Sequence, residues 1–230
     1  MNGARRERAV VLGVLLVGLV VAGCSAGASS SPAAAPTRTG SGYTGTSIAT
    51  SAPTKPPSPP RVYRGTGDNV VKIDKPDGVA VMAFSCPKCT SNTIVQTDGA
   101  DLVVVNTIGA YTGKREIDAD TGSVTTQLTV KADATWTVTV GGLDLADKSL
   151  GNQGVSGKGD DVVLLGGLSS SAAIRNQGGT SNFIIKSFAL NINDNQLPVN
   201  KIGNYEGTVH LDQPALVEVT SDGNWSISPV

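Results

Sequence analysis

Histidine is nearly absent from this sequence, because His210 is the only one among 230 residues. A hydrolase of the Ser–His–Asp type would have to use this residue. His210 lies in residues 208–212 (TVHLD), where apolar and polar side chains alternate as in a strand with one exposed face. No G-x-S-x-G segment, which would present a nucleophilic serine, occurs after residue 61. We therefore expect a surface histidine and no catalytic residues.

Positive charge is also scarce relative to nucleic-acid-binding proteins. The chain has 18 lysines and arginines against 19 aspartates and glutamates, which gives a formal net charge of −1. Proteins that bind nucleic acids neutralise phosphates with clustered basic side chains. Nucleic acid is therefore not expected among the partners.

Long apolar runs are missing except at the N-terminus. Arg5, Arg6 and Arg8 form a basic start, and residues 9–23 then carry no charge. A helix of these residues would be about 22 Å long, which is short of the roughly 30 Å hydrocarbon core of a bilayer. Residues 1–23 are therefore predicted to be a secretory signal peptide rather than a permanent membrane span.

Cysteine occurs only three times, and the first follows this apolar run. Residues 21–24 (VAGC) resemble the lipobox of bacterial lipoproteins: a branched apolar residue, two small residues and a cysteine. The resemblance implies cleavage between Gly23 and Cys24, and lipid on the sulfur of Cys24. It also implies a place on the extracytoplasmic face of the cell membrane, since two or more acyl chains hold a protein stably there. The alternative is an ordinary secretory signal that ends by chance at a cysteine.

Large apolar side chains are rare in residues 24–61. After Cys24 this segment consists almost wholly of Ser, Thr, Pro, Ala and Gly, and it holds seven of the twelve prolines. Such a composition cannot bury enough apolar surface to offset the entropy lost on ordering. We expect a disordered tether, with a root-mean-square span of roughly 35 Å, that lifts the rest of the chain off the membrane.

The remainder of the sequence contains an internal repeat. Residues 65–71 (GTGDNVV) return as residues 157–163 (GKGDDVV). Three more segments return in the same order: 90–92 (TSN) as 180–182 (TSN), 106–113 (NTIGAYTG) as 200–207 (NKIGNYEG), and 133–138 (DATWTV) as 222–227 (DGNWSI). Four ordered matches indicate a tandem duplication. We place module 1 at residues 62–141, a linker at 142–156 and module 2 at 157–230.

Each module is predicted to be all-β. Short segments rich in Val, Ile and Thr are separated by turn residues, and no segment after the signal has a convincing helical pattern. In residues 135–140 (TWTVTV), apolar side chains alternate with threonine at the period of a half-buried strand. About seven strands in each module would form a small β-sandwich of immunoglobulin-like architecture. In module 1 strands are expected at 79–84, 93–96, 102–106, 126–130 and 135–140.

Three of the repeated segments also carry a resemblance. The G-x-G-D-[ND]-V-V start, the N-x-I-G-x-Y-x-G segment and the closing D-x-x-W strand, present in both modules, resemble a module of secreted proteins and lipoproteins from actinobacteria and other bacteria. That group has no assigned activity. The resemblance therefore implies an architecture and no chemistry.

Cys86 and Cys89 form a C-x-x-C segment between two expected strands. In an exported protein an even pair of cysteines predicts a disulfide, and here it would staple a hairpin loop. Dithiol exchange is the alternative, although that chemistry is suited to a motif at the start of a helix. A zinc site usually has four ligands, and no second C-x-x-C is present, so no metal site is expected.

Calcium is the only cofactor for which the sequence offers candidates. Oxygen-bearing side chains alternate in residues 118–122 (DADTG), and residues 191–195 (NINDN) form a similar cluster. An EF-hand loop that began at Asp118 would need a glutamate at its twelfth position, where this sequence has Thr129. Asp and Asn are common in turns for backbone reasons alone. No metal ligands are assigned, and calcium stays an alternative.

Two aromatic pairs occupy equivalent places in the repeat: Trp136 with Trp225, and Tyr111 with Tyr205. Each tryptophan alternates with Val or Ile, so we expect it to anchor a core. Each tyrosine lies among glycine-rich turn residues and is expected to fix a strand corner through its hydroxyl. The tyrosines are also the candidate binding residues, because aromatic rings on a sandwich can stack on sugars or peptides.

These features predict a membrane-anchored, surface-displayed lipoprotein that is not an enzyme and that binds or supports an unknown protein or glycan of the cell envelope. Duplication would raise avidity if both modules engage one partner. Two alternatives stay open. One is an envelope enzyme, either a hydrolase or a thiol-redox protein that uses Cys86 and Cys89, and the other is a purely structural stalk.

Replacing Cys24 tests the membrane anchor. The Cys24→Ala chain should be lost from the membrane fraction, because it has no sulfur to receive lipid. Immunoblots of fractionated cells measure this, and Ser25→Ala serves as a neighbouring control that keeps the cysteine. Unchanged membrane fractionation of Cys24→Ala would show that something other than this lipid holds the protein.

Overall fold

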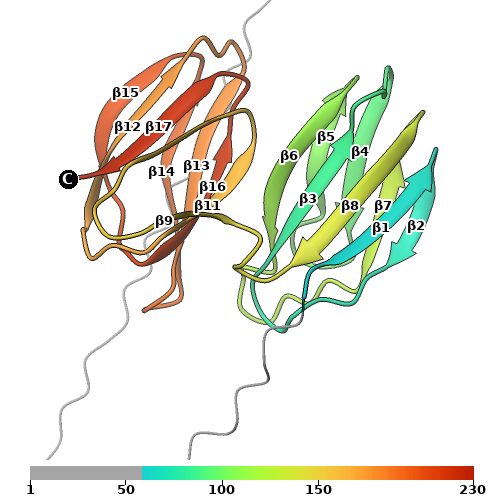
Figure 1. Ribbon diagram of the computed structural model, residues 1–230, viewed down its shortest axis with the longest axis horizontal. Helices are drawn as coiled ribbons and strands as arrows, with labels where there is room; N and C mark the ends of the chain where they lie inside the picture. Colours follow the sequence, from blue (N-terminus) through green and yellow to red (C-terminus); the bar gives the residue numbers. More distant parts are fainter. Residues whose placement is uncertain (1–58) are drawn as a thin grey trace, which may run out of the picture. The chain divides into compact units, whose positions relative to one another are not determined.

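The computed structural model describes residues 59–230, and every regular element in this part of the chain is a β-strand (Figure 1). The all-β fold is therefore confirmed. None of the described residues belongs to a helix that is long and apolar enough to cross a membrane. The predicted signal peptide, Cys24 and nearly all of the predicted tether lie outside the described residues.

Module 1 is a sandwich of two four-stranded antiparallel sheets, with the orders β1-β8-β3-β6 and β2-β7-β4-β5. We call the first the front sheet and the second the back sheet. The front sheet consists of β1 (Arg61–Thr66), β8 (Thr135–Gly141), β3 (Ala80–Cys86) and β6 (Tyr111–Ile117). The back sheet consists of β2 (Asn69–Lys72), β7 (Gln127–Lys131), β4 (Asn92–Thr97) and β5 (Val103–Ile108).

Module 2 repeats this strand order, with a front sheet β10-β17-β12-β15 and a back sheet β14-β13-β16-β11-β9. Two β-sandwich modules are therefore present, as the repeat predicted. The front sheet consists of β10 (Val155–Lys158), β17 (Asn224–Pro229), β12 (Ser171–Gln177) and β15 (Tyr205–His210). The back sheet consists of β14 (Asp194–Ile202), β13 (Asn182–Ala189), β16 (Ala215–Thr220), β11 (Asp161–Leu165) and β9 (Asp147–Ser149).

The connectivity within each sandwich is that of a jelly roll. In module 1 the first strand pairs with the eighth, the second with the seventh, the third with the sixth and the fourth with the fifth. This nested pairing is a long hairpin rolled into two layers of four strands. An immunoglobulin constant domain has seven strands in a different order. The expected likeness to an immunoglobulin domain thus extends to the two-layer architecture and not to the strand order.

The segment 142–156 is more than the linker expected from the sequence. Residues Asp147–Ser149 form β9, which pairs in parallel with Val163–Leu165 on β11, and β10 already begins at Val155. Module 2 therefore begins before residue 157. A strand of three residues is too short to show an alternating pattern, and its pairing depends on an edge that only the folded module provides.

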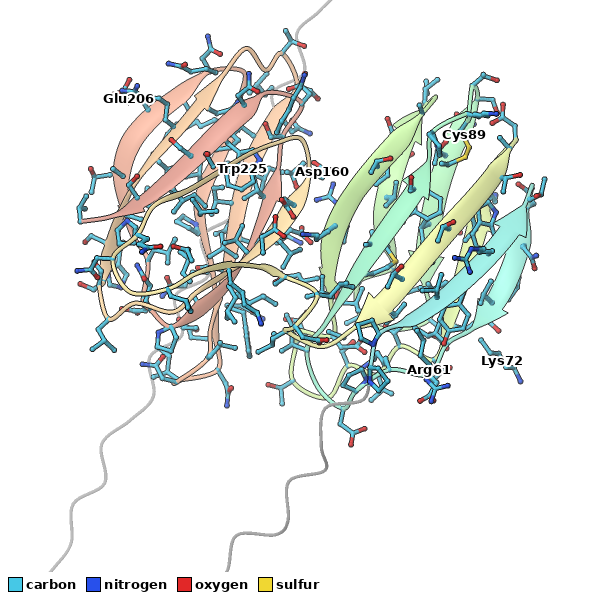
Figure 2. The ribbon with its side chains drawn as sticks, viewed as in Figure 1. Arg61, Lys72, Cys89, Asp160, Glu206 and Trp225 are labelled. Atoms are coloured by element: carbon cyan, nitrogen blue, oxygen red, sulfur yellow. A yellow bond between two sulfur atoms is a disulfide. The ribbon has the colours of Figure 1, made fainter. Side chains whose placement is uncertain are left out.

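Each core is formed by the inward-facing side chains of both sheets, and a tryptophan lies in each. Trp136 is 1% exposed and Trp225 is 3% exposed. The indole N–H of Trp136 donates to the carbonyl of Gly67 at 2.9 Å, and that of Trp225 donates to Gly159 at 2.8 Å. Burial with a satisfied N–H is the arrangement in which a tryptophan stabilises a core. Figure 2 shows Trp225 inside the sandwich of module 2.

The repeated G-x-G-D and D-x-x-W segments are two halves of this one contact. Gly157 pairs with Trp225 across β10 and β17, and a Cβ atom on Gly157 would lie 2.3 Å from Cζ2 of the indole ring. Gly65 and Trp136 repeat the arrangement in module 1, at 2.2 Å. Only glycine lets the ring lie this close to the neighbouring backbone.

The Gly157→Ala substitution tests this contact. Its methyl group overlaps the buried indole, so we expect module 2 to lose about 1–3 kcal/mol of unfolding free energy, the usual cost of overpacking a core. Urea unfolding followed by circular dichroism measures the loss. Ser156→Ala, at the exposed neighbouring position, is the control. Equal stability of the two variants would contradict the packing role of Gly157.

Candidate functional site

The Asp of the repeated G-x-G-D segment accepts an equivalent backbone hydrogen bond in each module. Asp68 accepts a hydrogen bond from the backbone N–H of Ala132 at 3.0 Å, and Asp160 accepts one from the N–H of Ser221 at 2.9 Å. Both contacts use the Oδ1 atom. The second oxygen of Asp160 has a further role, because it reaches module 1.

Oδ2 of Asp160 binds two side chains of β6. The hydroxyl of Tyr111 donates to it at 2.8 Å, and Nη2 of Arg115 lies 2.6 Å away. Nη1 of Arg115 also contacts Oε1 of Glu218 at 3.3 Å and Oγ1 of Thr220 at 2.5 Å. The Arg115 side chain is only 13% exposed, so its charge is balanced by two carboxylates in a place with little water. Both modules belong to one compact unit, and this network joins them.

Apolar packing and a second ion pair accompany the network. Val81 of β3 packs with Val162, Leu216 and Phe188 of the module 2 back sheet, and each of these four side chains is buried. Nζ of Lys114 lies 2.5 Å from Asp147 and 3.1 Å from Asp161. The outer face of the module 1 front sheet therefore meets the outer face of the module 2 back sheet. The residues that form this interface were not predicted from the sequence.

Two glutamates meet at the centre of the interface. Oε2 of Glu218 accepts the backbone N–H of Glu116 at 2.9 Å. Glu116 is 7% exposed, and its own Oε2 atom is buried without a hydrogen-bond partner among the described residues. Burial and the negative charge of Glu218 raise the pKa of Glu116 from 4.5 to about 8. Glu116 is therefore mostly protonated at neutral pH.

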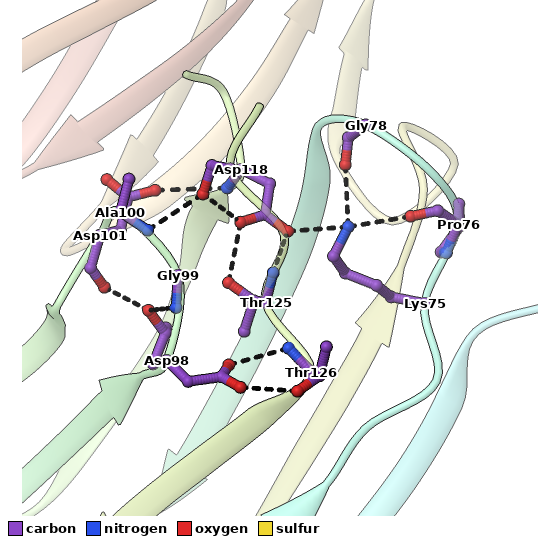
Figure 3. Close-up of polar contacts among 12 residues, drawn as sticks. Lys75, Pro76, Gly78, Asp98, Gly99, Ala100, Asp101, Asp118, Thr125 and Thr126 are labelled. Carbon is purple, nitrogen blue, oxygen red and sulfur yellow. Dashed lines mark hydrogen bonds and ion pairs between the residues drawn. The ribbon is translucent and has the colours of Figure 1, made fainter. Parts of the chain in front are cut away.

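The predicted calcium segment at 118–122 is held by contacts within module 1 (Figure 3). Asp118 accepts hydrogen bonds from Ser123 and from the N–H and hydroxyl of Thr125, and it lies 2.8 Å from Nζ of Lys75. Burial opposes the charge of Asp118, but these contacts outweigh it and hold its pKa below the usual value. The carboxylate is thus already satisfied by protein groups.

The second calcium candidate, 191–195, contacts the first. Nδ2 of Asn195 donates to Oδ1 of Asp120 at 2.8 Å. Within residues 59–230, no group of three or more His, Cys, Asp or Glu side chains is placed to hold a metal ion. Calcium binding stays a prediction, and the arrangement of these side chains does not favour it.

Cys86 and Cys89 are joined by a disulfide, drawn in yellow in Figure 2. Both residues are buried in the core of module 1, at 0% and 4% exposure. The loop that they staple is not the expected hairpin, because β3 lies in the front sheet and β4 in the back sheet. A crossing between sheets and a hairpin have the same local sequence signals, so the strand pairing decides between them.

The two candidate tyrosines face the sandwich rather than the solvent. Tyr111 packs on Phe84 with ring centroids 6.1 Å apart, and Tyr205 packs on Phe183 at 5.8 Å. The Tyr111 hydroxyl is used at the interface, as described above. Both rings are half-buried, so their positions support the structural role over stacking on a ligand.

The front sheets carry grooves at equivalent positions. The module 1 groove has a volume of about 310 Å³, and the module 2 groove about 370 Å³. A glycine lies in each, Gly113 or Gly207, and in module 1 Lys158 and Asp160 of module 2 also line the groove. The other equivalent lining pairs include Ala83 with Ala173, Thr112 with Glu206, Thr137 with Ser226, and Thr139 with Ser228.

The interface residues could have been found from differences between the two copies. Residues 114–116 (KRE) follow Y-T-G in module 1, whereas residues 208–210 (TVH) follow Y-E-G in module 2. His210, the counterpart of Glu116, has a 63% exposed side chain that contacts Asp212 at 3.1 Å. It is a surface histidine, as expected. Charge that one copy has and the other lacks marks the face where module 1 meets module 2.

Comparison with known proteins adds no assignment. No protein-family model matches the chain, and no curated protein matches it. Among solved structures, the stem and receptor-binding domain of the spike protein P1 from bacteriophage PM2 is similar at 11% sequence identity, over 78% of this chain and 81% of that chain, with a TM-score of 0.18. A likeness at this level supports no conclusion about fold or function.

The Glu116→Gln substitution tests the buried carboxyl. Between pH 4.5 and about 8, folded wild-type protein keeps a proton on Glu116 that the unfolded chain has already released. The unfolding free energy of the wild type should therefore fall as the pH rises across this range. Glu116→Gln should lose that fall and be the more stable protein at pH 8. Urea unfolding across the pH range measures the difference, with the exposed Glu206→Gln as control. A difference from wild type that is constant with pH would mean that Glu116 is ionised throughout.

Proposed function

We propose that this chain is a membrane-anchored, surface-displayed lipoprotein that is not an enzyme and that binds a glycan of the cell envelope through its two front-sheet grooves. The observation that carries the proposal is the recurrence of the same groove in both modules. The expected lipid on Cys24 and the expected tether would present the modules to the envelope. Cys24 and nearly all of the tether lie outside the described residues.

The lining of the grooves favours a glycan over a protein. Thr137 and Thr139 in module 1, and Ser226 and Ser228 in module 2, offer hydroxyls that can both donate and accept hydrogen bonds. Protein interfaces usually depend on aromatic or arginine anchors in dry pockets. The aromatic rings next to these grooves point into the cores, and Arg175, which lines the module 2 groove, is paired with Glu206. A polymer rich in hydroxyls therefore fits the surface better than a protein.

The interface between the modules would make the two grooves act together. Asp160 both lines the module 1 groove and binds Arg115 of module 1. A fixed relation between two sites on one polymer can raise the combined affinity by roughly 10²–10⁴ over either site alone. Duplication then has a direct use in binding.

The thiol-redox alternative has less support. Dithiol exchange requires a thiolate to reach a partner disulfide, and reactive cysteines are partly exposed. Cys86 and Cys89 are buried at 0% and 4% exposure in the module 1 core. Their position favours a structural bond.

Blocking the grooves tests the proposal. Thr139→Trp and Ser228→Trp each place a large ring in one groove, so each should weaken sedimentation of the protein with isolated cell-wall glycan, and the double variant should lose most of it. Thr129→Trp, a half-buried threonine on the back sheet of module 1, is the matched control. Wild-type binding by the double variant would place the site elsewhere. No binding by the wild-type protein would favour the structural stalk.

A further inference from the structure

A hollow of about 280 Å³ lies at the interface, apart from the two grooves. Asp101, Glu116 and Asp120 line it from module 1, and Lys186, Asn195 and Leu197 line it from module 2. The lining thus contains three carboxyl groups and one ammonium group, that of Lys186.

The hollow has more acceptors than donors. Oε2 of Glu116 is buried without a partner, so its charged form would be costly and the carboxyl keeps a proton instead. The side-chain amides of Asn195 and Gln196, which both line the hollow, already donate to Asp120 and Asp194. Lys186 is 47% exposed on its side chain, and its Nζ lies 3.7 Å from Glu218 rather than in contact with Glu116.

The group that could take the place of the Glu116 proton is a compact cationic donor. A calcium ion takes six to eight oxygen ligands, and the described residues hold no cluster of three acidic side chains placed for a metal. A primary ammonium group has three donors and no acceptor. Its aliphatic stem would contact Leu197 and Ala119, which also line the hollow.

We propose that this hollow binds a primary ammonium group of an envelope ligand, with the Glu116 carboxylate as its main partner and Asp101 and Asp120 at its rim. This site goes beyond the proposed glycan grooves and does not depend on them. Within residues 59–230 it occurs once, since module 2 has the exposed His210 in place of Glu116.

Binding at this site is linked to a proton. Burial and Glu218 keep Glu116 protonated below about pH 8, so an arriving ammonium group must displace that proton. The apparent affinity should therefore rise roughly tenfold per pH unit below this pKa, with about one proton released for each ligand bound. The charged groups that face Glu116 are Glu218, Asp101, Asp120 and Lys186.

A matched pair of small probes tests the site on the full-length chain. Nα-acetyl-lysine methylamide carries a free ammonium group, and its Nε-acetylated form is the neutral control. Calorimetry at two pH values, in buffers of different ionisation enthalpy, measures affinity and proton release. We expect the charged probe alone to bind, more tightly at pH 7.5 than at pH 6.5, with release of a proton.

Variants separate the site from its surroundings. Glu116→Gln should abolish binding and proton release while unfolding stays cooperative, and a substitution at an exposed carboxyl outside the grooves, Asp144→Asn, should change neither. Lys186→Met should strengthen binding several-fold, because a competing ammonium group is removed. Equal binding of the two probes, no binding at millimolar concentration, or binding of calcium chloride in place of the charged probe would each overturn the assignment.

Discussion

The two-module structure depends on the contacts that the carboxylate of Asp160 makes. One of its oxygens accepts a hydrogen bond from the N–H of Ser221 in module 2, and the other binds Arg115 and Tyr111 of module 1. Arg115 is largely buried, and removing one partner of a buried ion pair is far more costly than the pair itself is stabilising. The interface is therefore specific: Asp68, the counterpart of Asp160, makes only the contact within its own module among the described residues.

The duplication explains both what the modules share and what separates them. Shared residues hold each sandwich together, as Gly157 does beneath Trp225 and Gly65 beneath Trp136. The residues that differ, Lys114, Arg115 and Glu116, lie where the copies meet. Their counterparts in module 2 are Thr, Val and His, which could not form the same ion pairs. The two modules thus share one interface of this kind, and it lies where the two copies differ.

Polar groups at this interface differ in how well they are satisfied. Arg115 and Asp160 have close partners, and so do Lys75 and Asp118 within module 1. Glu116 has none for its Oε2 atom and keeps its proton instead. Nε of Arg115 is likewise buried without a hydrogen-bond partner, although both of its Nη atoms are paired. Incompletely satisfied polar groups reduce stability, and they recur where proteins bind ligands. This contrast is the physical basis for treating the hollow as a site.

Four features could be predicted from the sequence: the all-β class, the duplication, the burial of the tryptophans and the five expected strands, which match β3, β4, β5, β7 and β8. Period-two alternation and repeated turn residues are local signals, so they survive without coordinates. Only the tertiary structure shows strand β6, the parallel β9, the jelly-roll order, the interface and the grooves. They depend on which strands pair and which faces meet, and residues far apart in the chain supply both sides of each contact. Cys86 and Cys89 show the limit, since their pairing was expected but the crossing between sheets was not.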